Sequence, residues 1–62
     1  MDQIIAIQQC GRNAARARRN NDEAGAKFET DYALKMIRLE EDPRQGHIAF
    51  EKAYKDFNEE YR

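Results

Sequence analysis

The chain has 62 residues and a mass of 7.3 kDa, which suffices for one folded domain. Charged residues make up 37% of it and apolar residues 40%, a balance typical of a globular chain rather than a disordered one. No run of residues approaches the roughly 18 apolar residues of a membrane-spanning helix, and the N-terminus lacks the basic-then-apolar pattern of a signal peptide. We therefore expect a cytoplasmic protein without a membrane segment, and the single cysteine, Cys10, fits a reducing compartment.

The apolar residues are few, and many of them are small. Nine are alanine, and neither valine nor tryptophan is present. Burying one large apolar side chain gives about 1.5–3 kcal/mol, whereas ordering each residue costs about 1.5 kcal/mol. A monomer is expected to be marginally stable on these terms, so the composition predicts self-association, with a homodimer as the simplest form.

Periodicity and capping residues predict an all-α protein, either a helical hairpin or a three-helix bundle, in a single domain over residues 1–62. Asp2 is a good N-cap, Asn20-Asn21 favours a break, and Asp42-Pro43 favours the end of one helix and the start of another. β-branched residues are scarce and no two-residue alternation persists, which argues against strands. The predicted helices span residues 3–19, 21–41 and 43–61.

Two capping patterns support these boundaries. Asn20 with Glu23, and Asp42 with Gln45, have the spacing at which a cap residue and a side chain three positions later bond each other's backbone. On the sequence alone, Asn20-Asn21 is either a turn between two helices or a kink within one long helix.

The 43–61 segment carries the clearest predicted core face. Its apolar residues recur every three or four positions, and charged residues fill the opposite side. Because no polar cluster accompanies the aromatic rings, they are interpreted as core rather than as a ligand-stacking surface. The face comprises Gly46, His47, Phe50, Ala53, Tyr54, Phe57 and Tyr61.

The 3–19 segment has a face of mostly small residues. Small side chains let another helix approach closely, so Gly11, which is costly inside a helix, predicts a close contact. That contact is either with another helix of the same chain or with a second copy. The face comprises Ile4, Ile7, Cys10, Gly11, Ala14 and Ala17.

Arginines occupy the opposite face of the 3–19 segment. Arg12, Arg16 and Arg19 share this face, and Arg18 lies beside them in the sequence. They are candidates for binding an acidic protein surface or nucleic-acid phosphates; otherwise they form a solvated face that pairs with the acidic helices. Residues 1–20 hold four basic and one acidic residue, whereas residues 21–62 hold seven basic and eleven acidic ones. Since most of the chain is acidic, we rank a protein partner above nucleic acid.

The 21–41 segment has two apolar arcs on nearly opposite sides. A helix at the edge of a small bundle needs one apolar face, so the second arc predicts either a central position or a surface for another chain. The first arc holds Ala24, Gly25, Phe28, Tyr32, Met36 and Leu39. The second arc, with the stray Ile48, is the predicted self-association surface: Ala26, Ala33, Leu34, Ile37 and Ile48.

No arrangement of residues points to catalysis, a cofactor or a metal. His47 and Glu51 have a spacing that can hold a metal ion, but two ligands without a third make a weak site. Cys10 has no evident base beside it, so it is interpreted as a packing thiol that forms an intermolecular disulfide only on oxidation. We therefore expect no enzymatic activity.

These observations predict a small non-enzymatic interaction module, such as an adaptor, inhibitor or regulator, that binds a larger protein partner. A phage or bacterial accessory factor is the setting we expect for so small a helical chain. The second hypothesis is a nucleic-acid-binding accessory protein that uses the arginine face, and the third is a small structural subunit of an assembly.

Overall fold

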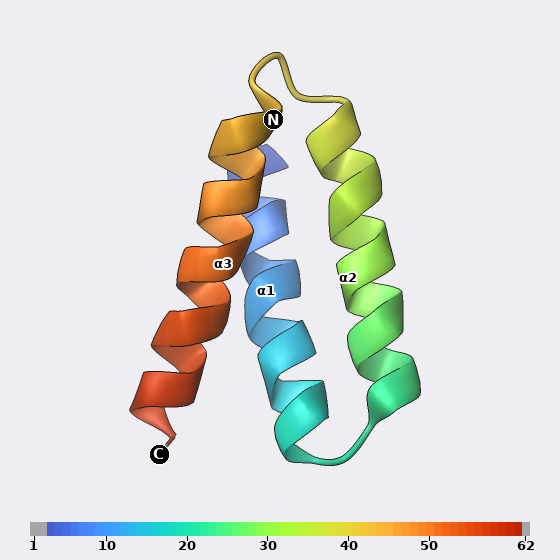
Figure 1. The fold of residues 1–62 in the computed structure, drawn as a ribbon, viewed down its shortest axis with the longest axis vertical. Coiled ribbons are helices and arrows are strands. Elements are labelled where there is room, and N and C mark those ends of the chain that lie inside the picture. The colour runs from blue at the N-terminus through green and yellow to red at the C-terminus, as the bar shows by residue number, and fades with distance from the viewer. Residues whose placement is uncertain (1–2, 62) are drawn as a thin grey trace.

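The computed structural model describes residues 3–61. It contains three α-helices: α1 (Gln3–Arg19), α2 (Glu23–Arg38) and α3 (Pro43–Glu60). The helices run alternately down and up, so that α2 is antiparallel to both of its neighbours (Figure 1). No strand occurs between residues 3 and 61, which confirms the all-α prediction and the three-helix alternative within it.

The α1–α2 connection is a true turn rather than a kink. Asn21 has a left-handed backbone conformation with φ of 59°. The N–H of Asn21 donates to the carbonyl of Arg18 at 3.1 Å, and that of Asp22 donates to the carbonyl of Ala17 at 2.8 Å. These two bonds form a Schellman motif, which ends α1 because Asn tolerates the left-handed region better than most residues do.

The cap of α2 is Asp22, not Asn20 as the capping pattern predicted. The Asp22 carboxylate accepts a hydrogen bond from the backbone N–H of Gly25 at 2.9 Å. Because Asn20 and Asn21 form the turn that ends α1, α2 begins at Glu23, two residues later than predicted.

In the α2–α3 connection, the predicted start of α3 is confirmed. Asp42 is the N-cap of α3 and accepts from the backbone N–H of Arg44 at 3.2 Å, with Pro43 in the first turn. At the other end of the connection, α2 ends at Arg38 with Leu39 as its C-cap, and Glu40 and Glu41 belong to the loop. The predicted cap of α1, Asp2, lies outside the described residues.

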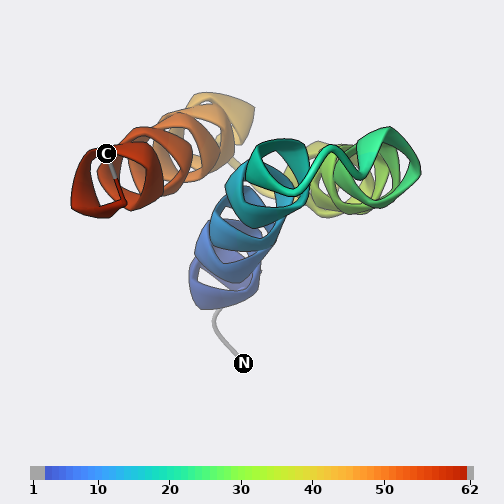
Figure 2. The same ribbon diagram turned by 90° about the horizontal axis from the view of Figure 1, so that it is seen from below.

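Helix α1 packs along both of the other helices, whereas α2 and α3 scarcely touch each other. Figure 2 shows the result end-on: α2 and α3 diverge on either side of α1. The core lies along α1, where Ile7 is fully buried and packs with Ile37 of α2 and Ala49 of α3. This arrangement makes α1 the central helix.

The small-residue face of α1 is an intramolecular contact. A Cβ on Gly11 would lie 2.6 Å from the backbone carbonyl oxygen of Phe50 and 3.1 Å from the Cβ of Ala53. The absence of a side chain therefore lets α3 approach α1 at this point. Since Cys10, Gly11 and Ala14 are buried within one chain, this face is not open to a second copy.

Through residues 3–61, none of the helices combines the length and the apolar character needed to cross a bilayer.

Candidate protein-binding groove

A groove lies between α2 and α3, on the side where the two helices diverge. One end is a hollow of about 210 Å³, and the groove continues toward the C-terminal end of α1 through the residues Thr30, Phe50 and Glu51, which line both parts. The full set of lining residues is Arg18, Thr30, Ala33, Leu34, Ile37, His47, Phe50, Glu51, Tyr54 and Lys55.

The groove offers apolar surface that the fold does not use completely. Leu34, Phe50 and Tyr54 are half-buried, and the rings of Phe50 and Tyr54 are stacked with centroids 6.3 Å apart. Leu34 and Phe50 each pack against the core on one side and face the groove on the other. A helix from another protein, laid along α2 and α3, would bury the parts of these side chains that remain exposed.

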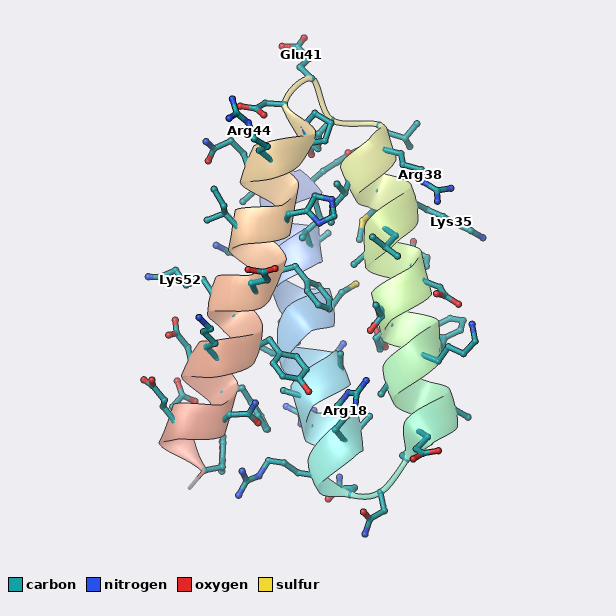
Figure 3. All side chains as sticks on the ribbon, in the orientation of Figure 1. Arg18, Lys35, Arg38, Glu41, Arg44 and Lys52 are labelled. Carbon is teal, nitrogen blue, oxygen red and sulfur yellow. The ribbon has the colours of Figure 1, made fainter. Side chains whose placement is uncertain are left out.

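Arg18 lines the groove, although the sequence analysis placed it only beside the candidate face of Arg12, Arg16 and Arg19. It follows Gly11 and Ala14 by seven and four residues, so it belongs to the core-facing line of α1 and not to the arginine face. It is nevertheless exposed, because α2 and α3 have diverged at that level (Figure 3). No hydrogen bond or ion pair joins the side chain of Arg18 to any residue in the range 3–61. A helical wheel of 3–19 would have singled out this cation.

The predicted arginine face is largely occupied by α3. The Arg12 guanidinium donates to the Glu60 carboxylate at 3.0 Å, and this bond lowers the pKa of Glu60. The guanidinium carbons of Arg12 and Arg16 lie 5.5 and 5.7 Å from the centroid of the Phe57 ring. These distances fit cation–π contacts, so both side chains cover the edge of the core. Arg19 remains exposed.

The structure reverses the roles of the two apolar arcs of α2. Three of the five predicted self-association residues, Ala26, Ala33 and Ile37, are at most 3% exposed within a single chain. Leu34 faces the groove, and Ile48, at 56% exposure, lies on α3 outside it. The arc expected to be core is the exposed one instead, with Phe28, Tyr32 and Leu39 more than half exposed.

Cys10 is a packing thiol, as predicted. Burial and a hydrogen bond from the thiol to the Glu29 carboxylate raise its pKa to about 11. A thiol held in its protonated form is a poor nucleophile. Because it is buried against α2, Cys10 is also badly placed for a disulfide between chains.

The predicted weak metal pair, His47 and Glu51, lies at the groove and is exposed. In the described part of the chain, no group of three or more histidine, cysteine or acidic side chains is arranged to hold a metal ion.

Comparison with known proteins gives no relative: no protein-family model, no curated protein and no solved structure matches the chain.

Proposed function

We propose that the protein is a small non-enzymatic interaction module, an adaptor, inhibitor or regulator, that binds a larger protein partner in the α2–α3 groove. The observation that carries this proposal is the pairing of half-buried apolar side chains, Leu34, Phe50 and Tyr54, with the exposed guanidinium of Arg18. The proposed ligand is an amphipathic helix of the partner.

The chemistry of the groove specifies the ligand further. An apolar ridge with residues spaced by three and four positions matches the surface of Leu34 and Phe50. A carboxylate on the same helix would neutralise Arg18, which otherwise brings an unpaired charge into a contact that excludes water. We therefore propose a ligand helix with an aspartate or glutamate beside its apolar ridge.

The proposal also includes the setting expected from the sequence, a cytoplasmic accessory factor of a phage or bacterium. Its support is the single buried thiol, which suits a reducing compartment. A structural subunit of an assembly would use the same groove permanently rather than reversibly.

We further propose that the chain acts as a homodimer. The support is the group of large apolar side chains exposed on α2, Phe28, Tyr32 and Leu39, in a domain with a thin core.

The contacts of the arginine face give the nucleic-acid hypothesis less support than the sequence gave it. Arg12 and Arg16 contact Phe57, and Arg12 also holds Glu60. A phosphate would have to compete with these contacts.

A charge reversal in the groove tests the proposed function. Arg18→Glu should reduce retention of the native partner about tenfold, because it places like charges together at the contact. Arg19→Glu is the matched control, since it makes the same change at the adjacent residue outside the groove. The measurement is quantitative mass spectrometry of proteins captured from native-host cells with each variant.

A second pair of variants tests the apolar part. Leu34→Ser should reduce retention, whereas Ile48→Ser, at an exposed position outside the groove, should not. All four variants should keep the helix content of the unaltered chain, and circular dichroism measures it. If Arg18→Glu and Leu34→Ser each retain the partner as well as the unaltered chain does, the groove is not the binding surface.

A further inference from the structure

The two walls of the α2–α3 groove differ in chemistry. On the α2 side, none of the lining residues within the range 3–61 is charged, and the one hydroxyl, that of Thr30, donates to the backbone carbonyl of Ala26 at 2.8 Å. On the α3 side, the lining residues include the carboxylate of Glu51 and the ammonium group of Lys55. A helix that lies in the groove therefore has an uncharged wall along one edge and a charged wall along the other.

The charges that line the groove change sign along its length. Glu51 lines both parts of the groove, whereas Arg18 and Lys55 line only the part toward the C-terminal end of α1. At the other end, the wall of the 210 Å³ hollow contains no lysine or arginine from residues 3–61. Glu51 and Lys55 are four residues apart, which is about 6 Å along α3. One end of the groove is therefore acidic and the other is basic.

The three charges are not neutralised within the described chain. No ion pair or side-chain hydrogen bond joins Arg18, Glu51 or Lys55 to another residue of the range 3–61. By contrast, Lys27 and Asp31, in the adjoining hollow beside α2, are paired with each other at 3.0 Å. A helix bound in the groove removes water from the three unpaired charges, so each favours binding only if the ligand places an opposite charge beside it.

We infer that the groove selects a helix whose edge toward α3 carries one basic and one acidic residue about one turn apart. The basic residue lies beside Glu51, and the acidic residue lies beside Arg18 and Lys55. This inference rests on the proposed function: it keeps the amphipathic helix and its carboxylate at Arg18, and it adds the second charge, the spacing and the edge on which both charges lie.

The distribution of charge favours this ligand over a uniformly acidic helix. A uniformly acidic edge would be attracted by Arg18 and Lys55 but repelled by Glu51. The two charges also have to share one edge, because the α2 wall offers no counter-ion. Reversing a helix in the groove exchanges the edges that face α2 and α3, so an edge with both charges faces α3 in only one direction. Only one order of base and acid along that edge therefore fits.

Three synthetic helical peptides test the inference. They share a ridge of leucines spaced by three and four residues, and they differ only at two positions one turn apart on one edge. These positions hold lysine then glutamate, glutamate then lysine, or glutamine at both. Fluorescence anisotropy measures the affinity of the whole chain for each labelled peptide. One mixed order should bind about tenfold more tightly than the other and more tightly than the glutamine peptide, and the ratio should shrink at high salt.

Exchanging the two charges of α3 tests their assignment to particular residues. Glu51→Lys combined with Lys55→Glu keeps the net charge and should reverse the preference between the mixed peptides, by a smaller ratio because Arg18 is unchanged. The matched control is Lys52→Glu combined with Asp56→Lys, an exchange with the same spacing at residues that do not line the groove. Lys52 points away from α2 (Figure 3), so the control should keep the original preference.

The possible results separate the inference from the proposed function. If the three peptides bind with equal affinity, the charges do not select the ligand and the inference is wrong, although the groove still binds an amphipathic helix. If the preference is unchanged by the exchange of Glu51 and Lys55, other charges are responsible and the inference is again wrong. If none of the peptides binds at millimolar concentration, both the inference and the proposed helix-binding groove are wrong.

Discussion

The backbone carbonyl oxygen of Phe50 lies 2.6 Å from the position that a Cβ on Gly11 would occupy. The contact joins the middle of α1 to the middle of α3, and the neighbouring Ala53 is also only 3.1 Å from that position. Because the nearest atom belongs to the backbone, it cannot move aside by a side-chain rotation. Gly11 therefore determines how closely the two helices pack.

Gly11→Ala should destabilise the fold although alanine is the better helix former. Because the nearest atom is backbone oxygen at 2.6 Å, displacing α3 is expected to cost about 2–3 kcal/mol, the upper part of the usual range for overpacking. This cost exceeds the gain in helix propensity of about 1 kcal/mol. Urea unfolding followed by circular dichroism measures the difference. Gln8→Ala, at an exposed position of the same helix, should change the free energy of unfolding by less than about 0.5 kcal/mol.

Ile37→Glu should unfold the protein. Ile37 is only 3% exposed and packs with Ile7 and Ala49, so a carboxylate there has no water and no partner. We expect a loss of about 4 kcal/mol or more. Tyr32→Glu, on the exposed arc of the same helix, should keep its helix content. Equal helix loss in both variants, measured by circular dichroism, would contradict the assignment of the two arcs.

Phe57→Ala should cost about 3–5 kcal/mol, the usual range for removing a buried phenylalanine. Phe57 is 4% exposed, and the loss of its ring also leaves Arg12 and Arg16 without their contact. Thermal melting provides the measurement. Phe28→Ala makes the same change at a residue that is 65% exposed, and it should lower the melting temperature far less.

The Cys10 thiol should react slowly and should make the fold sensitive to alkali. Its pKa is about 11 in the folded protein, against an ordinary value of 9.0. The difference reduces the thiolate fraction about 100-fold near neutral pH, so alkylation should be slower by a similar factor than in urea.

The sign of the pH effect follows from the same pKa. Above pH 9 the unfolded chain loses the thiol proton while the folded chain keeps it, so stability should fall as the pH rises from about 9 to about 11. Cys10→Ala should lose this part of the alkaline dependence. A pH profile of urea unfolding that is the same for both proteins would be evidence against it.

Duplex DNA should not bind appreciably at physiological salt. Arg12 and Arg16 are engaged with α3, and residues 21–61, which hold more acidic than basic residues, lie close by. An anisotropy titration at ~0.15 M salt tests this expectation. Submicromolar binding that disappears when Arg12, Arg16 and Arg19 are all changed to Gln, in a variant that still folds, would restore the nucleic-acid hypothesis.

The sequence alone predicted the three helices and most of their boundaries. Asp42-Pro43 marked the start of α3 because proline suits the first turn of a helix and aspartate caps it. Asn20-Asn21 marked the end of α1, although only the backbone shows that Asn21 adopts the left-handed conformation that makes the break a turn. Gly11 likewise predicted a close contact, and α3 supplies it.

Which face of α2 is buried was decided only by the tertiary structure. Both arcs are apolar, so periodicity alone could not rank them. Ala26 and Ala33 have small side chains and are buried in the core, whereas the bulky rings of Phe28 and Tyr32 stay exposed. Close helix packing needs small residues on both surfaces, which is why the bulkier arc faces outward. Arg18 became part of a groove for a related reason: its position on α1 follows from the sequence, but its exposure depends on the divergence of α2 and α3.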